Sequence, residues 1–450
     1  MMFNSADIES LVSRALVIEC FEITLTQNVD ESPFTFCGPG SIKTQSDGQL
    51  SLKMYDAAKK SSISQMMRYG LYNQTGIVPE SDYFSLRAID SSGNVWVAPR
   101  LYIYDGLRMT PHGTIVEFQI PDIRTERIHP RSDLNGVSIA NAVIAGKFRL
   151  PFNKWQDQPD GSSSVSALDF EIDGARLKLS QKVQHLELDV ESDVREIDHE
   201  LLMTISESIS IAIGRDAWPT YYRLYNDGVT RSFINGRPDV KGLGMIKPLV
   251  DVFPYKTASL ISFVNHYVNN RDEEHRYLVY YWRRLYHVSS RIGDVAALVL
   301  TVNIEGLVNN YFSAGRAPSE RVLGEVNYSK KLIRSLRLPS STNSRIKNVL
   351  GAMKKLSAPN ILRVLEAEGV IESVHVKSWN DLRHSLAHAG NSESDPVTTS
   401  KFFLDIENCL DLFYRLIGLS VGYDASLVEG VESLKPAEIV VEEEGGGSGR

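Results

Sequence analysis

The sequence has few cysteines and no long apolar run, and both shortages restrict what the protein can be. Its 450 residues include three cysteines, Cys20, Cys37 and Cys409, which are too few and too scattered for a disulfide framework or a CxxC metal clamp. The most apolar stretch, 295–308, is shorter than the ~20 residues that a membrane span needs. The first residues lack the basic region of a secretory signal. We therefore expect a soluble cytoplasmic protein that has no membrane partner.

The chain also lacks an overall positive charge and the loop motifs of common cofactor enzymes. Its formal net charge is −8 and its pI is about 5.8, so any surface that attracts nucleic acid must be local. It contains no GxxxxGK[ST] loop and no GxSxG elbow, and the stretch KGLGMIKP has only two of the glycines of a dinucleotide fingerprint. We expect no cofactor.

The hydrophobic periodicity changes once along the chain. From residue 17 to 188, apolar residues alternate with a period of two between turn signals, which is typical of β-strands. From Phe253 to Tyr423 the period is 3.6, which indicates helices. We therefore predict an α+β protein with four segments: a β-rich sandwich or barrel-like domain (1–215), a connecting segment (216–255), an all-helical bundle (256–425) and a disordered acidic, Gly/Ser-rich tail (426–450).

The stretch SWNDLRHSLAHAG gathers an arginine and two histidines on one predicted helix. Ser378 followed by Asp381 resembles a capping box, and Gly390 fits the position after the helix end. In such a helix Arg383 and His388 project about 140° apart with a rise of roughly 7.5 Å. One copy would not easily aim both at a small target, whereas two copies facing each other across a two-fold axis would surround a shared cleft.

Two other interpretations of this helix remain open. His384 and His388 are four residues apart on one face, a spacing that could hold zinc, but Ser385 stands where the HExxH motif has its glutamate. His375 is the nearest further histidine and lies outside the predicted helix. Alternatively, these residues form a solvated helix end, where His388 would favour the negative C-terminus. We expect no bound metal.

Glu305 is a second candidate site residue because it shares an apolar stripe with Leu298 and Val302. An unpaired carboxylate in a buried stripe would be costly, so Glu305 needs a partner there. Arg383 is the candidate, since a buried ion pair would fix the orientation of its guanidinium group. The alternative is that Glu305 lies at the edge of the stripe and reaches water.

A local basic segment precedes this helix in the sequence. Between residues 321 and 363 there are ten Lys or Arg residues and one acidic residue, although the whole chain is acidic. Such a segment beside a cleavage site is what a phosphate-binding groove requires, while a solvated helix face is the ordinary alternative. The predicted RNA-binding residues are Lys330, Lys331, Arg334, Arg337, Arg345, Lys347, Lys354 and Lys355.

Together these residues carry a family resemblance. RHSLAH resembles the R-φ-xxx-H signature of HEPN-domain ribonucleases, in which φ is a polar residue, and Arg383, His384 and His388 take the three motif positions. The signature lies late in a helical region with one long helix after it. With a β-rich half ahead of it, the chain resembles the Apea-like HEPN proteins of bacterial anti-phage abortive-infection systems.

The resemblance implies a metal-independent endoribonuclease of anti-phage defence that cuts RNA, with tRNA as one candidate, by attack of the ribose 2′-hydroxyl. The products would carry 2′,3′-cyclic phosphate and 5′-hydroxyl ends. His388 would move protons, Arg383 would hold the developing charge, and His384 would orient its neighbours or contact substrate, with Glu305 as our candidate support residue. The site would be composite across a homodimer or larger oligomer. The N-terminal domain would sense a phage-derived activator or restrain the nuclease. The alternative is a HEPN-like module that dimerises or binds RNA without catalysis.

Overall fold

The protein divides into two compact units in the computed structural model, which we call the sheet unit and the helical unit. The sheet unit comprises 1–210, 217–242 and 252–257, and the helical unit comprises 211–216, 243–251 and 258–450. The residues that the structure describes are 3–57, 78–103, 106–128, 136–157, 163–236, 246–253, 256–272, 274–289, 293–314, 316, 318, 320–336, 338–352, 356–387 and 396–424. The predicted disordered tail lies outside them.

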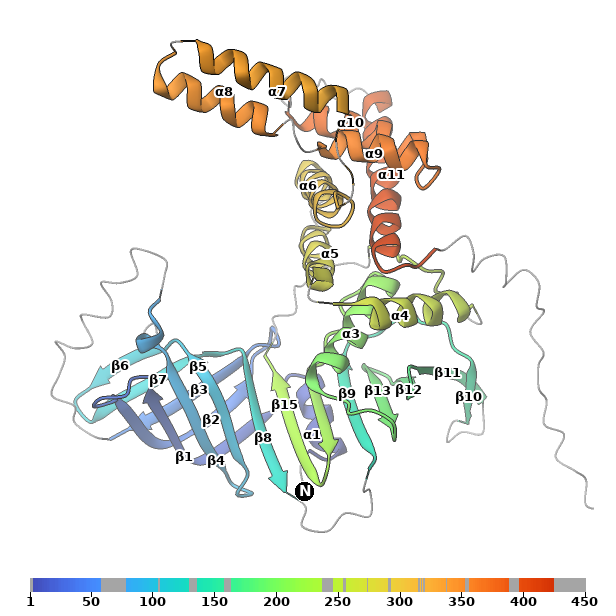
Figure 1. Ribbon diagram of the computed structural model, residues 1–450. Helices are drawn as coiled ribbons and strands as arrows, with labels where there is room; N and C mark the ends of the chain where they lie inside the picture. The colour runs from blue at the N-terminus through green and yellow to red at the C-terminus, as the bar shows by residue number, and fades with distance from the viewer. Residues whose placement is uncertain are drawn as a thin grey trace, which may run out of the picture. The chain divides into compact units, whose positions relative to one another are not determined.

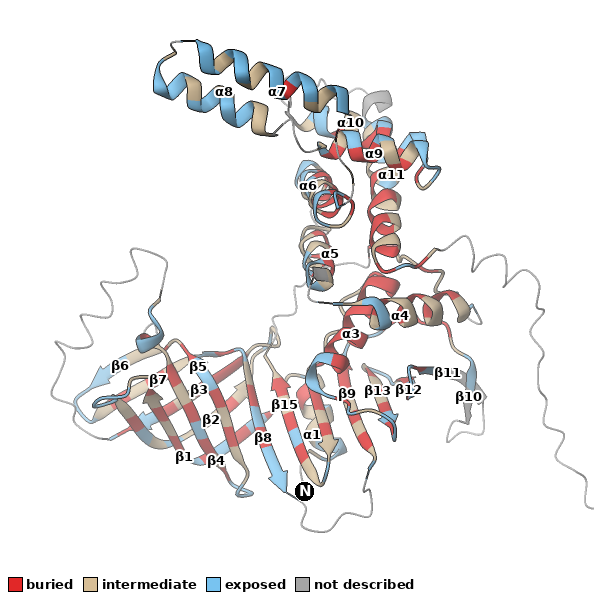
Figure 2. Cartoon of the chain, in the orientation of Figure 1, coloured by how far each residue is buried: buried red, intermediate tan, exposed pale blue. Residues whose placement is uncertain are grey.

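The sheet unit is built around one antiparallel sheet of fifteen strands (Figure 1). Its burial pattern alternates along the strands, as the period of two predicted, and Figure 2 shows this as alternating red and lighter bands. In sheet order the strands are β10 (Lys154–Asp157), β11 (Ser163–Ile172), β12 (Ala175–Gln181), β13 (His185–Ser192), β9 (Ser138–Ala145), β14 (Tyr221–Asn226), β15 (Val229–Asn235), β8 (Asp122–Ile128), β5 (Val95–Leu101), β4 (Phe84–Asp90), β1 (Val17–Gln27), β2 (Thr35–Thr44), β3 (Leu50–Asp56), β7 (Gly113–Ile120) and β6 (Leu107–Thr110).

The segment 216–255 was expected to be a connection between domains, but in the structure it supplies two central strands of the sheet. β14 pairs with β9 and β15 pairs with β8, so this hairpin joins the two halves of the sheet. Its turn is Asp227-Gly228, with φ of 48° and 77°. Positive φ at both turn residues is the geometry of the tightest hairpins, and Asp-Gly is a pair that favours it.

The strand order describes the sheet in more detail than the predicted sandwich or barrel-like packing. The described strands form one sheet whose order runs from β10 at one edge to β6 at the other, without a ladder between these two strands. One apolar face of β1 to β5, β7 and β8 packs into a single core together with α1 (Ser5–Val12). The coarse prediction of an α+β protein with a β-rich N-terminal half is confirmed.

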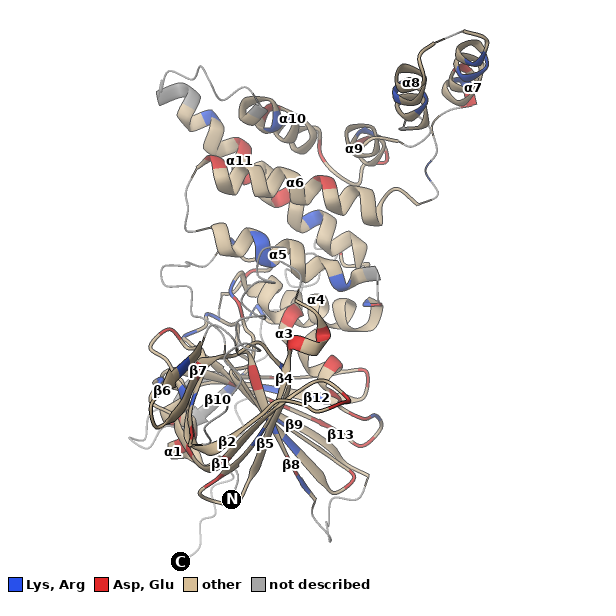
Figure 3. Cartoon of the chain, turned by 90° about the vertical axis from the view of Figure 1, so that its left-hand side faces the viewer, with Lys and Arg blue, Asp and Glu red and all other residues tan. Residues whose placement is uncertain are grey.

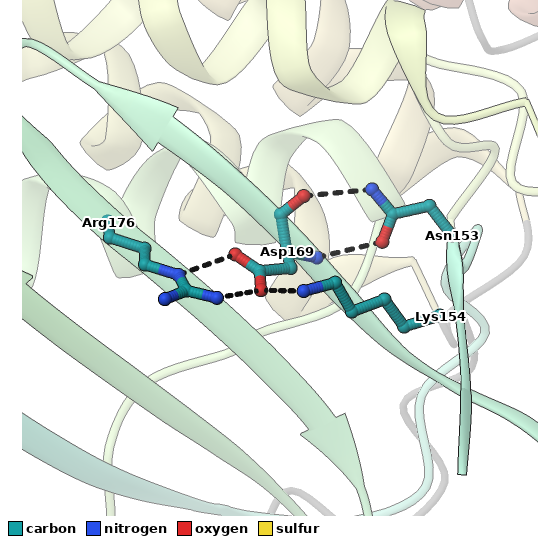
Figure 4. A network of polar contacts seen from close by, with 4 residues as sticks. All are labelled: Asn153, Lys154, Asp169 and Arg176. Atoms are coloured by element: carbon teal, nitrogen blue, oxygen red, sulfur yellow. Dashed lines mark hydrogen bonds and ion pairs between the residues drawn. The ribbon is translucent and has the colours of Figure 1, made fainter.

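A network of polar contacts fastens the edge strands β10, β11 and β12 (Figure 4). Asp169 on β11 accepts hydrogen bonds from Lys154 and, at 2.8 Å and 3.2 Å, from the Arg176 guanidinium. Asn153 exchanges two hydrogen bonds with the Asp169 backbone. The hydrogen bonds from Arg176 and Lys154 outweigh the effect of burial and lower the pKa of Asp169 to about 2. This carboxylate therefore stays charged at neutral pH and stabilises the edge.

The helical unit contains the elements that carry the candidate site. α6 packs against α5, α10 and α11, and α10 also contacts α9. None of the helices in the described part of the chain is long and apolar enough to cross a membrane. The helices are α4 (Ala258–Asn270), α5 (Tyr277–Val288), α6 (Asp294–Tyr311), α7 (Glu320–Ser335), α8 (Ser340–Ala352), α9 (Ala358–Ala367), α10 (Ser373–Ala387) and α11 (Pro396–Ser420), while α3 (His199–Ile213) and the short turns η2 (Glu80–Asp82) and η4 (Glu274–Arg276) complete the fold.

Candidate functional site

The helix that carries the candidate residues, α10, begins five residues before the predicted start. Ser378 lies inside α10, is buried, and accepts a hydrogen bond from the Asn408 side chain at 3.0 Å, so the predicted capping box does not form. At the start of the helix, the backbone N–H of Glu372 instead donates a hydrogen bond to Nδ1 of the His375 side chain at 3.2 Å. His375 is therefore part of α10. The predicted C-terminal Gly390 lies outside the described residues.

Arg383 is held from two sides on α10. Its guanidinium lies 3.5 Å from Oε2 of Glu305 on α6, and its central carbon lies 5.4 Å from the ring centroid of Trp379, one turn earlier on α10. Trp379 is fully buried, and its indole N–H donates to the Thr301 carbonyl of α6 at 3.2 Å. Because Thr301 and Glu305 are one turn apart, the same two helix faces meet at both contacts.

The structure combines the two alternatives left open for Glu305, because the side chain pairs with Arg383 and also reaches water. The Arg383 and Glu305 side chains are 50% and 39% exposed. The pair is exposed because α6 is apolar on two faces. One face, with Leu300, Ile304 and Leu307, is buried in the core, and the other, which contains Glu305, faces solvent. Val295, Leu298 and Val302 on this second face are all exposed. A pair this exposed contributes at most about 1 kcal/mol to stability. Its effect is on the orientation of the arginine.

The remaining predicted catalytic residues are only partly placed. His384 follows Arg383 on α10 and is exposed. His388 lies outside the described residues, so the structure does not test its distance from Arg383. His375, the third histidine considered for zinc, is nine residues before His384, or about 13 Å along the helix axis. Within the described ranges, no group of three or more His, Cys, Asp or Glu side chains could hold a metal ion.

The predicted basic segment forms a helical hairpin, α7 and α8, which we call the basic hairpin (Figure 1). Both helices are largely exposed in Figure 2, and blue segments mark their Lys and Arg positions in Figure 3. Tyr328 and Leu332 are also exposed on α7, at 69% and 52%. Of the predicted RNA-binding residues, Lys331, Arg334, Arg345 and Lys347 are exposed and Lys330 is half-buried, while Arg337, Lys354 and Lys355 lie outside the described residues.

Sequence reasoning missed the contribution of Trp379. Its position four residues before Arg383 was visible, and this spacing places the two side chains on one helix face. What the sequence did not reveal is that the indole ring is anchored on Thr301 and so supplies a fixed surface for the guanidinium.

Comparison with known proteins adds no relative. No family model, curated protein or solved structure matches the chain. The resemblance to HEPN ribonucleases therefore remains a prediction from the residues named above.

Proposed function

We propose that the protein is a metal-independent endoribonuclease of anti-phage defence, in which Arg383 and His384 on α10 of a HEPN-like helical unit act together with His388. The observation that carries the proposal is the fixed, solvent-accessible guanidinium of Arg383, held between Glu305 and Trp379. An arginine that binds a phosphate must be accessible to the substrate, and its guanidinium group must point in a defined direction. Arg383 meets both requirements, whereas an ion pair that only stabilises the fold requires neither.

The chemistry follows from what each side chain can do. The ribose 2′-hydroxyl attacks the adjacent phosphate, and Arg383 stabilises the additional negative charge on the phosphorane oxygens. His388 takes the proton from the nucleophile or gives one to the leaving 5′-oxygen, which contributes about 10²- to 10⁴-fold to the rate. His384 orients its neighbours or contacts the substrate. The products are a 2′,3′-cyclic phosphate and a 5′-hydroxyl.

The basic hairpin is the proposed RNA-binding surface. Lys331, Arg334, Arg345 and Lys347 present exposed cations to the phosphate backbone. Because phosphate contacts position a nucleic acid without reading its sequence, this surface explains affinity and leaves the choice of target to contacts near the cleaved bond. RNA, with tRNA as one candidate, is the proposed substrate.

The exposed stripe on α6 supports the proposed composite site. Val295, Leu298 and Val302 are 49%, 51% and 44% exposed and follow one another at helical spacing up to Glu305. A second copy that covered this stripe would exclude water around the ion pair and bring a second Arg383 nearby. A homodimer, or a larger oligomer, is therefore the proposed active form, in the cytoplasm.

Regulation is proposed for the sheet unit. A nuclease that attacks cellular RNA must be inactive at rest, so the sheet unit would restrain the helical unit until it meets a phage-derived activator. This role rests on the resemblance to Apea-like HEPN proteins. It predicts low basal cleavage by the purified protein and an increase when lysate of phage-infected cells is added.

The second candidate function is a binding module without catalysis. It is favoured by the exposed apolar residues beside the cations of the basic hairpin, since Tyr328 and Leu332 on α7 and Leu336 just after it recur at a spacing of four. Aromatic and apolar side chains among cations suit RNA bases or another protein, and neither requires cleavage.

The deciding experiment is cleavage of total cellular RNA and tRNA in EDTA, with and without infected-cell lysate. Wild type is compared with Arg383→Ala, His388→Ala and the control Lys401→Ala, which removes an exposed pair with Asp381. Loss of cleavage in the first two variants only supports the nuclease. Protection from phage by His388→Ala cells at the wild-type level would instead support the binding module.

A further inference from the structure

The helical unit contains a cavity that the proposed nuclease does not use. Its volume is about 370 Å³, which lies within the range of roughly 300 to 1,000 Å³ of small-molecule sites. It is lined by the start of α10, the C-terminal half of α11 and the segment 247–249, all of which belong to the helical unit. The polar side chains in its wall include Lys247, Glu372, His375, Asp411, Tyr414 and Arg415.

His375 offers a buried N–H group to this cavity. The side chain is 7% exposed, and burial lowers its pKa against the opposing effect of Glu372 and Asp411. Its Nδ1 accepts the Glu372 backbone N–H, so the proton of the neutral ring is on Nε2. No described residue forms a hydrogen bond with Nε2, and this donor is available to a ligand.

Tyr414 lines the cavity, but its hydroxyl group is not available to a ligand there. The Oη atom is fully buried. The Trp282 side chain approaches Oη and partly offsets the rise in the pKa of Tyr414 that burial causes. Because Trp282 is not among the residues of the cavity wall, the Tyr414 hydroxyl group faces the core of the unit.

Arg415 completes a set of donors in the cavity wall. Its Nε donates to the Val370 carbonyl at 2.6 Å, which fixes the plane of the guanidinium. Its terminal nitrogens make no hydrogen bond with any described residue. Three carboxylates also line the cavity: Asp411 is paired with Lys247 at 2.6 Å, Glu372 is exposed and Asp424 is half-buried. His375, which is more buried than these carboxylates, is a donor.

We propose that this cavity binds a small molecule through an oxyanion, either phosphate or carboxylate, that accepts hydrogen bonds from His375 Nε2 and the Arg415 guanidinium. The planar guanidinium suits both groups because it can form two parallel hydrogen bonds. Glu372 then accepts from an amino or hydroxyl group of the same molecule. Arg383 lies eight residues after His375 on α10, about 12 Å along the helix axis, so the cavity is separate from the cleavage site. The proposal is independent of the proposed function.

The test is isothermal titration calorimetry on the full chain with three probes: inorganic phosphate, adenosine 5′-monophosphate and glutamate. Binding of the nucleotide without glutamate assigns the site to phosphate, and the reverse assigns it to carboxylate. The cavity variants are Arg415→Lys and His375→Asn, and the asparagine keeps an acceptor near the Nδ1 position. Arg316→Lys is the control, because Arg316 pairs with Glu368 in the same unit.

We expect each cavity variant to weaken binding of the recognised probe by about tenfold or more and the control to leave it unchanged. Failure of all three probes to bind at millimolar concentration, or equal affinity in the cavity variants and wild type, would overturn the proposal. RNA cleavage in the same preparations shows separately whether the nuclease proposal holds.

Discussion

Glu305→Gln tests whether the ion pair on α6 orients Arg383 for catalysis. The substitution keeps the size of the side chain and one acceptor oxygen but removes the charge that lies 3.5 Å from the guanidinium. Because the partners are 50% and 39% exposed, the lost ion pair should change the free energy of unfolding by less than about 1 kcal/mol. Stability and activity can therefore be separated with this variant.

The effect on cleavage should be larger than the effect on stability. A positioned group that stabilises transition-state charge contributes roughly 10² to 10³ to the rate, and looser positioning forfeits part of this. We expect kcat to fall about tenfold in Glu305→Gln, with KM nearly unchanged, because the substrate affinity of the basic hairpin is not altered. Arg383→Ala should lose the full factor.

The assay is single-turnover cleavage of a defined RNA, measured beside urea unfolding of the same proteins. Asp381→Asn is the matched control, because Asp381 lies on α10 and forms a 2.9 Å surface pair with Lys401, away from Arg383. Equal cleavage rates for Glu305→Gln and Asp381→Asn, with Arg383→Ala inactive, would refute the reasoning that Glu305 orients the arginine.

Three further substitutions test the packing of the two units. Asp169→Asn should lower the free energy of unfolding at pH 7 by about 2 kcal/mol. Because the pKa of Asp169 is depressed in the folded state, this stabilisation is present above pH 3.8 and is lost as the pH falls to about 2. In urea unfolding, the free energy of the variant should therefore change less with pH across this window than that of wild type. Gly38→Ala would place Cβ 1.9 Å from the Tyr55 carbonyl oxygen, so we expect a loss of more than about 3 kcal/mol in urea unfolding, and a loss under 1 kcal/mol would contradict this packing. Trp379→Phe removes the hydrogen bond to Thr301 and part of a buried ring, which should cost about 2 kcal/mol and reduce cleavage; wild-type cleavage at reduced stability would show that the indole is only structural.

The sequence predicted the architecture where a single periodicity ran for many residues. Strand alternation and helical spacing separated the two kinds of structure correctly. The β14–β15 hairpin was missed although Asp227-Gly228 is a strong turn signal, because a short hairpin outside the main run of strands resembles a linker. Its place between β9 and β8 depends on pairings more than 75 residues apart in sequence, which local pattern does not encode.

The sequence predicted which residues of the candidate site pair, but it did not predict how exposed the pair is. Glu305 on an apolar stripe required an explanation, and this reasoning led to Arg383. The sequence could not show which of the two apolar faces of α6 packs into the core, because amphipathic spacing is the same for a buried stripe and an exposed one. The cavity at His375, Tyr414 and Arg415 was invisible for another reason, since its wall combines two helices and a loop that are distant in sequence.

The most direct test of the central claim is cleavage of one RNA in EDTA before and after the 2′-hydroxyl at the mapped cleavage site is replaced by hydrogen. We expect wild type to cut the all-ribose RNA to a 2′,3′-cyclic phosphate and to leave the 2′-deoxy position uncut, and we expect Arg383→Ala to cut neither RNA. Cleavage at the 2′-deoxy position, or wild-type cleavage by Arg383→Ala, would show that the protein does not use the 2′-hydroxyl and Arg383 in this way.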